Sequence, residues 1–291
     1  MTIRYAFFGT GPLAESVLAS LDRAGFTPTL VVTKPDALAG RHMVLTPPTI
    51  KTWAEMKHLD VYQPESLKEL PEDSPLVTEE YDLFIVASYG KMIPEELLNL
   101  PKQGVLNVHP SLLPKYRGPS PIESALLDGV MTTGVSIMKL DAGMDTGPLL
   151  VQSAFMINPE STAGILEVEC GQMGGELLVQ VLPHYMEGTL IPKEQGEVDA
   201  TVCKKITKDV GEITLTTNAA EVQRKFRALT PWPSVYFFID HKDKKMRVKV
   251  TGVNLTLIGS DTLIGKDVIT KVIPEGKHEM TFEDFTRGYL N

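Results

Sequence analysis

The sequence predicts a protein of the α/β class, in which an open sheet of mostly parallel strands is followed by a small β-barrel. Over the first 110 residues, short apolar runs alternate with helical stretches, as they do in a parallel sheet covered by helices. The periodic spacing of apolar residues is lost near residues 187–201, where Gly, Pro and charged residues accumulate. Beyond this segment, short alternating strands are separated by polar turns. At 291 residues the chain is long enough for two unequal domains.

The first four strands are predicted from apolar runs, which lie near residues 3–9, 29–33, 82–87 and 105–109. A helix with apolar residues at helical spacing follows the first strand as far as Leu21. Pro47 with Pro48 begins a second helix and Pro94 a third, because proline fits the first helical turn. This order of elements is typical of a Rossmann-like sheet.

The second half of the chain changes pattern twice. Two strands, 134–140 and 149–156, are joined by the turn Asp-Ala-Gly-Met-Asp-Thr-Gly. A long helix is predicted over 163–186, with Ser161 as the residue that initiates it. A helix over 219–229 precedes the alternating strands, whose turns are HKDK, IGSD and IGKD. We therefore predict one domain over 1–187, a linker over 188–203, and a C-terminal β-barrel of the OB type over 204–291.

Charge divides the chain at a similar place. Residues 1–200 carry 13 Lys and Arg against 26 Asp and Glu, whereas residues 201–291 carry 15 against 11. A basic module on an acidic body indicates a polyanionic partner such as a nucleic acid, although a chance excess of solvated lysines gives the same balance.

Composition excludes several other classes of protein. The chain is 43% hydrophobic and 22% charged, which argues against disorder. Its apolar runs are far shorter than a membrane span and it lacks a signal-peptide pattern, so we expect a cytoplasmic protein. Cys170 and Cys203 are predicted to be two buried thiols rather than redox or zinc ligands. No two histidines are three or four residues apart, so no metal site is expected.

A glycine motif follows the first strand. The run from Gly9 to Ala14 matches G-x-G-x-x-A, which is typical of dinucleotide-binding sites. Pro12 removes a backbone donor that a pyrophosphate would use, and the second strand ends at Thr33 and Lys34 without a ribose-binding acid. We therefore interpret the motif as a tight turn that enters a helix, and a nicotinamide-dependent oxidoreductase remains an alternative.

The strongest candidate for chemistry lies at the end of the fourth strand. Asn107 and His109 are two residues apart, so they point to the same side of that strand, and ligands bind at the carboxyl ends of open α/β sheets. Asn can donate to a developing oxyanion, and His can polarise a carbonyl or shuttle protons. Asp145, in the later turn, could fix the tautomer and charge of the imidazole or could simply cap its own turn. Together they suggest an acyl-transfer site.

Three ordered segments resemble the formyltransferases that use 10-formyltetrahydrofolate. They are Asn-Val-His-Pro-Ser-Leu-Leu-Pro from residue 107, Lys-Tyr-Arg-Gly from residue 115 and Asp-Ala-Gly-Met-Asp-Thr-Gly from residue 141. Segments 33–41, 203–213 and 229–239 further resemble the branch of this family that acts on methionyl-tRNA, in which they are a mobile tRNA-contacting loop, an interdomain strand and the entry to the C-terminal domain.

The resemblance implies a role for each matching residue. It implies that Asn107 and His109 stabilise the tetrahedral oxyanion, that Asp145 orients His109, and that a bound water passes protons toward the departing folate nitrogen. Other residues are implied to bind the two substrates. Those expected to line the folate pocket are Ser88, Tyr89, Gly90, Ser111, Leu112, Leu113 and Pro114, and those expected to contact tRNA are Arg41, Lys204, Lys205 and Lys208.

The implied reaction is transfer of a formyl group from 10-formyltetrahydrofolate to the α-amino group of initiator methionyl-tRNA, by a monomer that needs no metal, membrane or protein partner. Two alternatives stay open. A sugar-amine formyltransferase would keep the same three catalytic residues but would not need a basic C-terminal domain. A non-catalytic RNA-binding module would not need Asn107, His109 and Asp145 to be intact.

Overall fold

The computed structural model describes residues 3–39, 43–241, 243–255 and 267–290. These residues form two compact units. The first unit comprises Met1–Pro119, Thr132–Phe155 and Glu167–Cys203, and the second comprises Ser120–Met131, Met156–Leu166 and Lys204–Asn291. Each unit is described by itself.

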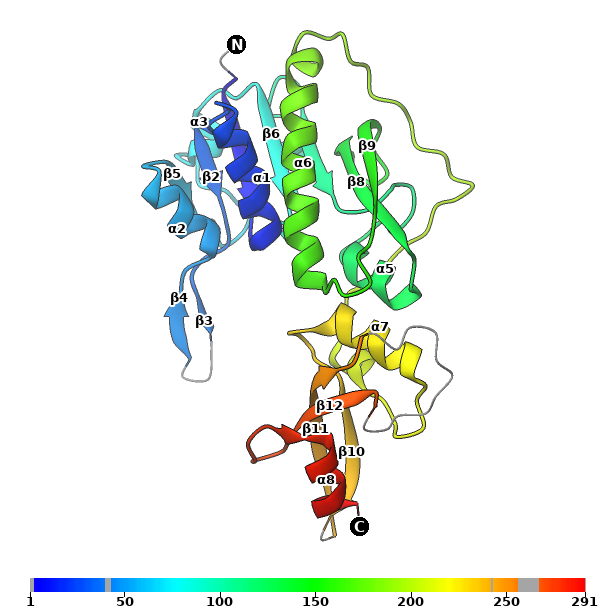
Figure 1. The fold of residues 1–291 in the computed structure, drawn as a ribbon. Coiled ribbons are helices and arrows are strands. Elements are labelled where there is room, and N and C mark those ends of the chain that lie inside the picture. The colour runs from blue at the N-terminus through cyan, green and yellow to red at the C-terminus, as the bar shows by residue number, and fades with distance from the viewer. Residues whose placement is uncertain (1–2, 40–42, 242, 256–266, 291) are drawn as a thin grey trace. The chain divides into compact units, whose positions relative to one another are not determined.

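A seven-stranded sheet forms the centre of the first unit, in the order β5-β2-β1-β6-β7-β8-β9 (Figure 1). The first five strands in this order run parallel, and β8 pairs antiparallel with β7. This arrangement confirms the predicted α/β class with a mostly parallel sheet. The strands are β1 (Tyr5–Gly9), β2 (Leu30–Val32), β5 (Asp60–Tyr62), β6 (Leu83–Ala87), β7 (Val105–His109), β8 (Thr132–Lys139) and β9 (Leu149–Met156).

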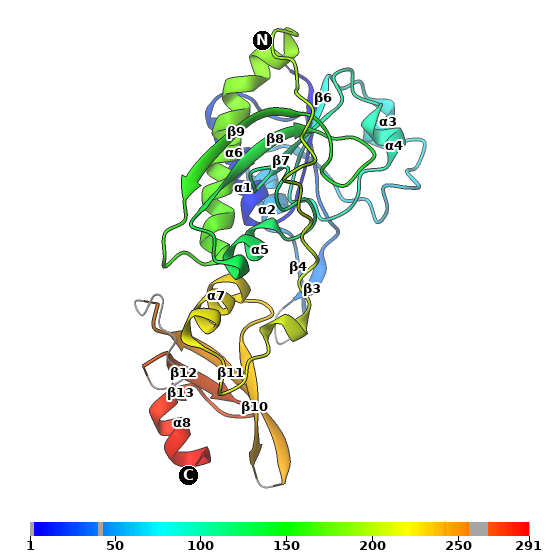
Figure 2. The same cartoon turned by 90° about the vertical axis from the view of Figure 1, so that its right-hand side faces the viewer.

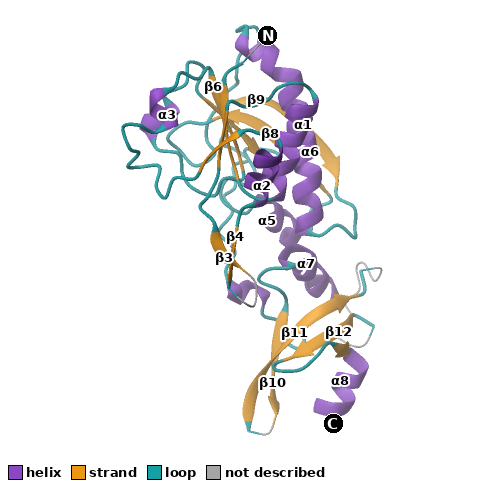
Figure 3. Cartoon of the chain, turned by 90° about the vertical axis from the view of Figure 1, so that its left-hand side faces the viewer, coloured by secondary structure: helices purple, strands orange, loops and turns teal. Residues whose placement is uncertain are grey.

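Helices cover both faces of this sheet. Figure 3 shows α1 (Pro12–Arg23) and α6 (Ala163–Met186) on one side and α3 (Pro75–Thr78) on the other. Two short helices complete the unit, α2 (Thr49–Met56) before β5 and α4 (Glu95–Leu98) after β6. The sequence predicted α1, α2, α4 and α6 but not α3, whose four residues are too few to show a period.

Glycine lets α6 approach its neighbours closely. A Cβ atom on Gly171 would lie 2.6 Å from the Leu13 carbonyl oxygen of α1, and one on Gly174 would lie 2.4 Å from Val108 of β7. Larger side chains would push the helix off the sheet, which would disturb the strand that carries His109.

The glycine motif after β1 forms the predicted tight turn into a helix. Gly11 has φ +84°, in the region that favours glycine, and Pro12 is the first residue of α1. A Cβ on Gly9 would lie 2.6 Å from the Cβ of Ala14, so the motif serves close packing of strand and helix.

The segment expected to be a tRNA-contacting loop contains a short hairpin. β3 (Ala37–Ala39) pairs antiparallel with β4 (Val44–Thr46). Leu38, Val44 and Leu45 on this hairpin are exposed, which explains why the sequence showed no periodic apolar face there. Arg41 lies outside the described residues.

The second unit is built on a four-stranded antiparallel sheet in the order β10-β11-β12-β13, in the part of the chain for which a small β-barrel was predicted. Its helices are α5, α7 and α8, and a short 3-10 helix, η1, precedes α7. Phe237, Phe282 and Phe285 lie in its core. The predicted turns IGSD and IGKD fall within residues 258–267, all but the last of which are outside the described residues. The bounds are α5 (Pro121–Asp128), η1 (Lys208–Gly211), α7 (Ala219–Leu229), β10 (Tyr236–His241), β11 (Lys244–Val253), β12 (Ile269–Pro274), β13 (Met280–Thr281) and α8 (Phe282–Tyr289).

Several sequence-based expectations concern the whole chain. Cys170 and Cys203 are buried thiols that form no disulfide, as predicted. In the part of the chain that the structure describes, no helix is long and apolar enough to cross a membrane. The same residues contain no group of three His, Cys, Asp or Glu side chains placed to hold a metal ion.

Candidate active site

His109 is the last residue of β7, where the parallel part of the sheet ends at its carboxyl edge. The imidazole side chain is 4% exposed, and Asn107, two residues earlier on the same side of the strand, is half-buried. Ser136 of β8 lies directly opposite His109 in the antiparallel register. The structure therefore places this Asn–His pair at the sheet edge where open α/β folds bind ligands.

Two oxygen acceptors flank the His109 ring. Its Nε2 lies 2.9 Å from the backbone carbonyl oxygen of Tyr116, so this nitrogen carries a proton and donates it. Its Nδ1 lies 3.7 Å from Oδ2 of Asp145. Nδ1 therefore faces a carboxylate, which can fix the tautomer and orientation of the ring.

Asp145 lies in the turn between β8 and β9 in a left-handed conformation, with φ +55°. Its Oδ2 accepts a hydrogen bond of 2.7 Å from the backbone N–H of Gly118, and its side chain is 15% exposed. Asp141 organises the same turn, because its carboxylate accepts from the Gly143 N–H and the Thr146 hydroxyl. The turn thus holds Asp145 beside His109 by backbone geometry and by one charged hydrogen bond.

Gly118 is the position in this loop that only glycine fits. Its φ is +114°, and a Cβ there would lie 2.6 Å from the carbonyl oxygen of Cys203. Any side chain would therefore displace residues 201–203 or withdraw the N–H that Asp145 accepts.

The turn after His109 is fixed by side chains of the antiparallel strands. The Ser136 hydroxyl donates to the Ser111 carbonyl over 2.6 Å and accepts from the Leu113 N–H over 3.1 Å. The Gln152 amide donates to the Leu113 carbonyl and to the Ser136 hydroxyl, at 2.8 Å each. Ser111 and Leu113 are buried while Leu112 and Pro114 are half-buried, so this turn is a rigid wall beside His109.

The second predicted folate-binding segment follows β6, the strand next to β7. Ser88 and Gly90 are exposed there, whereas the Tyr89 side chain points into the core and is 1% exposed. The Tyr89 ring packs edge-on against Phe8, and burial raises the pKa of its hydroxyl to about 12. This segment can therefore offer a ligand Ser88 and backbone groups rather than the Tyr89 phenol.

A hollow of about 290 Å³ borders the turn that carries Asp145. Leu98 and Leu140 supply apolar wall, and Lys102, Lys139 and Asp141 supply polar groups. The hollow borders Gly104, just before the start of β7, and none of the predicted site residues lines it.

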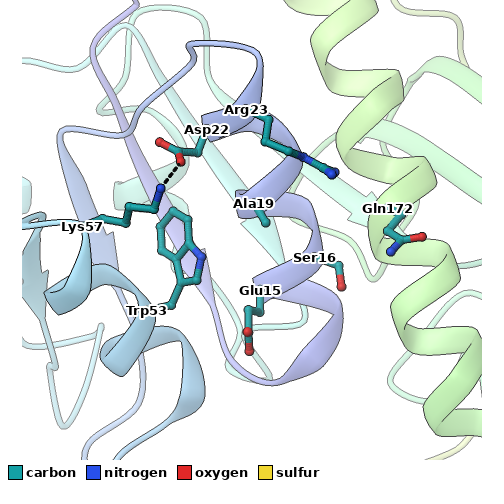
Figure 4. A pocket seen from close by; sticks show the side chains of 8 residues that line it. All are labelled: Glu15, Ser16, Ala19, Asp22, Arg23, Trp53, Lys57 and Gln172. Carbon is teal, nitrogen blue, oxygen red and sulfur yellow. Dashed lines mark ion pairs between the residues drawn. The ribbon is translucent and has the colours of Figure 1, made fainter.

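A second hollow, of about 280 Å³, lies between α1, α2 and α6 (Figure 4). Lys57 forms an ion pair of 2.9 Å with Asp22 there and stands over the ring of Trp53. None of the predicted site residues lines it.

The lysines predicted to contact tRNA belong to the second unit. Lys204, Lys205 and Lys208 are all exposed, and Lys208 begins η1. The fourth predicted tRNA residue, Arg41, has no described position.

Sequence reasoning missed Arg117 and Gln195, two residues that hold the site together. Arg117 is buried, and its guanidinium donates to the side chains of Gln195 and Glu197. Arg117 lies in the segment Lys-Tyr-Arg-Gly, which resembles the formyltransferases, but its burial was not expected because charged side chains are usually exposed. Gln195 stands in the segment where periodicity is lost, so no pattern singled it out.

Two protein-family models match this chain. The formyl transferase model matches residues 3–182, and the model of the formyl transferase C-terminal domain matches residues 205–266. The chain belongs to the formyl transferase family. The resemblance seen in the sequence is thereby confirmed.

Curated relatives agree with this membership. The chain is 36% identical over 301 residues to the methionyl-tRNA formyltransferase of Dehalococcoides mccartyi, a match that covers 98% of this chain and 96% of that one. It is 42% identical over 236 residues to the methionyl-tRNA formyltransferase of Chloroflexus aggregans, covering 81% and 76%.

Solved structures share the fold at much lower identity. An N-formyltransferase from Helicobacter canadensis in complex with folinic acid and dTDP-3-aminofucose has a TM-score of 0.61 at 20% identity, covering 87% of this chain and 91% of that one. HypX from Aquifex aeolicus in complex with tetrahydrofolic acid has a TM-score of 0.65 at 16% identity, covering 100% and 48%. At this identity the likeness establishes the fold.

Proposed function

We propose that this chain transfers the formyl group of 10-formyltetrahydrofolate to the α-amino group of initiator methionyl-tRNA. One observation carries the proposal: His109 and Asp145 meet at the carboxyl edge of the sheet, with Nδ1 and Oδ2 3.7 Å apart. This chain belongs to the formyl transferase family, and its relatives at 36–42% identity are methionyl-tRNA formyltransferases.

The chemistry requires a group that stabilises negative charge on the formyl oxygen as the unprotonated amine attacks the formyl carbon. Asn107 supplies an amide donor, and His109 supplies an imidazole on the same side of the strand. Asp145 faces Nδ1 and orients the ring, while the Tyr116 carbonyl accepts from Nε2. A water at the site passes the amine proton toward the departing folate nitrogen.

The formyl donor fits the surroundings of His109. The rigid turn of Ser111, Leu112, Leu113 and Pro114 and the end of β6 at Ser88–Gly90 border the strand end, and they offer the half-buried Leu112 side chain beside backbone polar groups. A flat pterin needs that combination of apolar walls and hydrogen-bonding groups. These residues would bind and orient the donor, which supplies the activated formyl group.

Charge supports tRNA as the acceptor. Residues 201–291 carry a balance of +4, and Lys204, Lys205 and Lys208 are exposed. On the antiparallel sheet of the second unit, the Arg247 guanidinium stacks 3.8 Å from the centre of the Tyr236 ring, and Lys245 stands 4.4 Å above Phe238. Aromatic rings alternating with cations suit a nucleic-acid backbone and its bases. We propose residues 204–291 as the tRNA-binding domain and Arg41 as a further tRNA contact.

We further propose that the protein acts as a monomer in the cytoplasm. All three proposed catalytic residues lie in one unit of one chain, so the site needs no second copy to be complete. The acceptor is a substrate of translation initiation, which takes place in that compartment.

The direct test is a formylation assay. The purified chain is incubated with 10-formyltetrahydrofolate and methionyl-tRNA, and the aminoacyl ester is hydrolysed and analysed by mass spectrometry. N-formylmethionine, formed only when enzyme and donor are both present, is the expected product. Binding of tRNA without any formyl product would favour the non-catalytic RNA-binding alternative instead.

A further inference from the structure

Residues 193–203 lie along the loop of residues 110–118 and along the turn that carries Asp145. They belong to the yellow-green segment after α6 in Figure 2. Lys193 exchanges two backbone hydrogen bonds with Leu149 at the start of β9, of 2.7 and 2.8 Å. Farther along, Val202 forms a parallel bridge with Arg117. Backbone contacts therefore hold this segment against β9 at one end and against Arg117 at the other.

Gln195 bridges two parts of that site with its amide group. Its Nε2 donates to the carbonyl oxygens of Asp145, at 2.9 Å, and Gly147, at 2.7 Å. Its Oε1 accepts from Nε and Nη2 of Arg117, at 3.1 and 3.0 Å. All four hydrogen-bonding positions of the amide are used, and the two carbonyls fix which end of the amide is nitrogen.

The bridge from Gln195 also supplies hydrogen bonds to the buried charge of Arg117. The Arg117 side chain is 6% exposed, and a buried charge is costly unless it is paired and hydrogen-bonded. Glu197 pairs with Nη2 at 2.9 Å, and the hydrogen bond from Arg117 holds the pKa of that carboxyl below its usual range. Gln195 supplies the acceptor that Nε requires.

The residues on either side of Arg117 are the ones that hold the catalytic pair. Tyr116 offers its carbonyl to His109 Nε2, and Gly118 donates its N–H to Asp145 Oδ2. The Thr201 hydroxyl accepts from the Tyr116 N–H, and the Arg117 backbone donates to the Thr201 carbonyl and accepts from the Cys203 N–H. Gln195 thus links the backbone of Asp145 to the side chain of Arg117. The two residues beside Arg117 contact His109 and Asp145.

We propose that Gln195 is a positioning residue for formyl transfer, which sets the distance between His109 and Asp145 without touching either substrate. The inference rests on the proposed function. A displacement of the Asp145 turn by a fraction of an ångström would alter the 3.7 Å separation of Nδ1 and Oδ2, and misplacement of catalytic groups on this scale is costly to turnover.

The test uses Gln195→Glu, which keeps the shape and the acceptor for Arg117 but replaces the amide donor by a second acceptor. Its added oxygen faces the carbonyls of Asp145 and Gly147 and repels them. Gln172→Glu, on the exposed surface of α6, is the matched control for the same chemical change. Each full-length variant is measured for kcat, for KM toward 10-formyltetrahydrofolate and methionyl-tRNA, for thermal stability, and for its active fraction by single-turnover amplitude.

We expect Gln195→Glu to lower kcat, and the single-turnover rate constant, at least tenfold while both KM values stay within about threefold of wild type. The Gln172→Glu control should match wild type. A purely structural role would instead reduce the amplitude, which counts folded enzyme, and leave the rate constant unchanged. That outcome, or a wild-type kcat for Gln195→Glu, would overturn the inference. A wild-type chain that formylates no methionyl-tRNA would refute the proposed function itself, so the two failures are distinguishable.

Discussion

At the scale of single residues, the site is built from backbone groups as much as from side chains. His109 is held by a carbonyl of Tyr116, and Asp145 by an N–H of Gly118. Both groups come from one short loop that glycine and a buried arginine shape. His109 and Asp145 are therefore each oriented by a backbone group of this loop.

The three proposed catalytic residues make the first prediction. Asn107→Ala and His109→Ala should each lower kcat about a hundredfold to a thousandfold, because each removes a group that stabilises charge only in the transition state. Folate binding, measured by fluorescence titration, should persist in both variants. Asp145→Asn should be severely impaired, because a neutral amide loses the negative charge that the carboxylate places beside Nδ1 of His109.

Asp141→Asn is the control for Asp145→Asn. Asp141 lies in the same turn and accepts from Gly143 and Thr146, which a side-chain amide oxygen can still do. It should retain most of the activity. Near-native turnover in His109→Ala would mean that the proposed mechanism is wrong even if the substrate is right.

Tyr89 gives a second prediction at this scale. Among the described residues its hydroxyl has no hydrogen-bond partner, and leaving a buried hydroxyl unpaired costs about 1–3 kcal/mol. Tyr89→Phe should therefore keep or raise the free energy of unfolding, measured by urea denaturation, with KM for the folate donor unchanged. A large rise in that KM would show that the phenol itself contacts the donor.

At the scale of elements, β7 was predictable and its surroundings were not. Asn107 and His109 could be placed from an apolar run that ends at a proline, because strand alternation is a local property. Gln195 is 50 residues from Asp145 and 78 from Arg117, so no local pattern records these contacts. The direction of the Tyr89 side chain could not be predicted, because a position at a strand end does not determine whether a side chain enters the core.

The β3–β4 hairpin makes the third prediction. Leu38, Val44 and Leu45 are about 60% exposed on an element that flanks Arg41, which suits contact with a large partner. Arg41→Ala should reduce formylation of methionyl-tRNA at least tenfold, as expected for loss of a charged hydrogen bond of about 1.5–3 kcal/mol. Arg41→Lys should also be impaired, because lysine lacks the planar fork of arginine.

The measurement for this prediction is kcat/KM for methionyl-tRNA beside the Kd for folate, which should stay at the wild-type value. Lys68→Ala, an exposed change elsewhere in the first unit, is the control. If Arg41→Ala formylated methionyl-tRNA normally, the proposed tRNA contact of Arg41 would be withdrawn.

At the scale of the whole molecule, charge is unevenly distributed. The acidic first 200 residues contain the proposed chemistry, and the basic last 91 residues contain an antiparallel sheet with stacked cations. Composition alone indicated this division, since net charge needs no knowledge of the fold. It did not indicate that residues 120–131 and 156–166 would pack with the C-terminal unit, because those contacts are distant in sequence.

The charge division makes the fourth prediction. If phosphate contacts drive tRNA binding, log K should fall linearly with log salt concentration, and replacing Lys204, Lys205 and Lys208 together by alanine should weaken binding and reduce that slope. Filter binding of methionyl-tRNA at several salt concentrations measures both quantities. An unchanged slope in the triple variant would exclude these lysines as phosphate contacts.

The most direct test of the account is a competition between acceptors. Methionyl-tRNA and a nucleotide-linked amino sugar are offered together to the enzyme with limiting 10-formyltetrahydrofolate, and the formylated products are quantified by mass spectrometry. The account predicts N-formylmethionyl-tRNA as the product in the wild type and its loss in His109→Ala. Formyl groups found on the amino sugar, with methionyl-tRNA left unmodified, would contradict it.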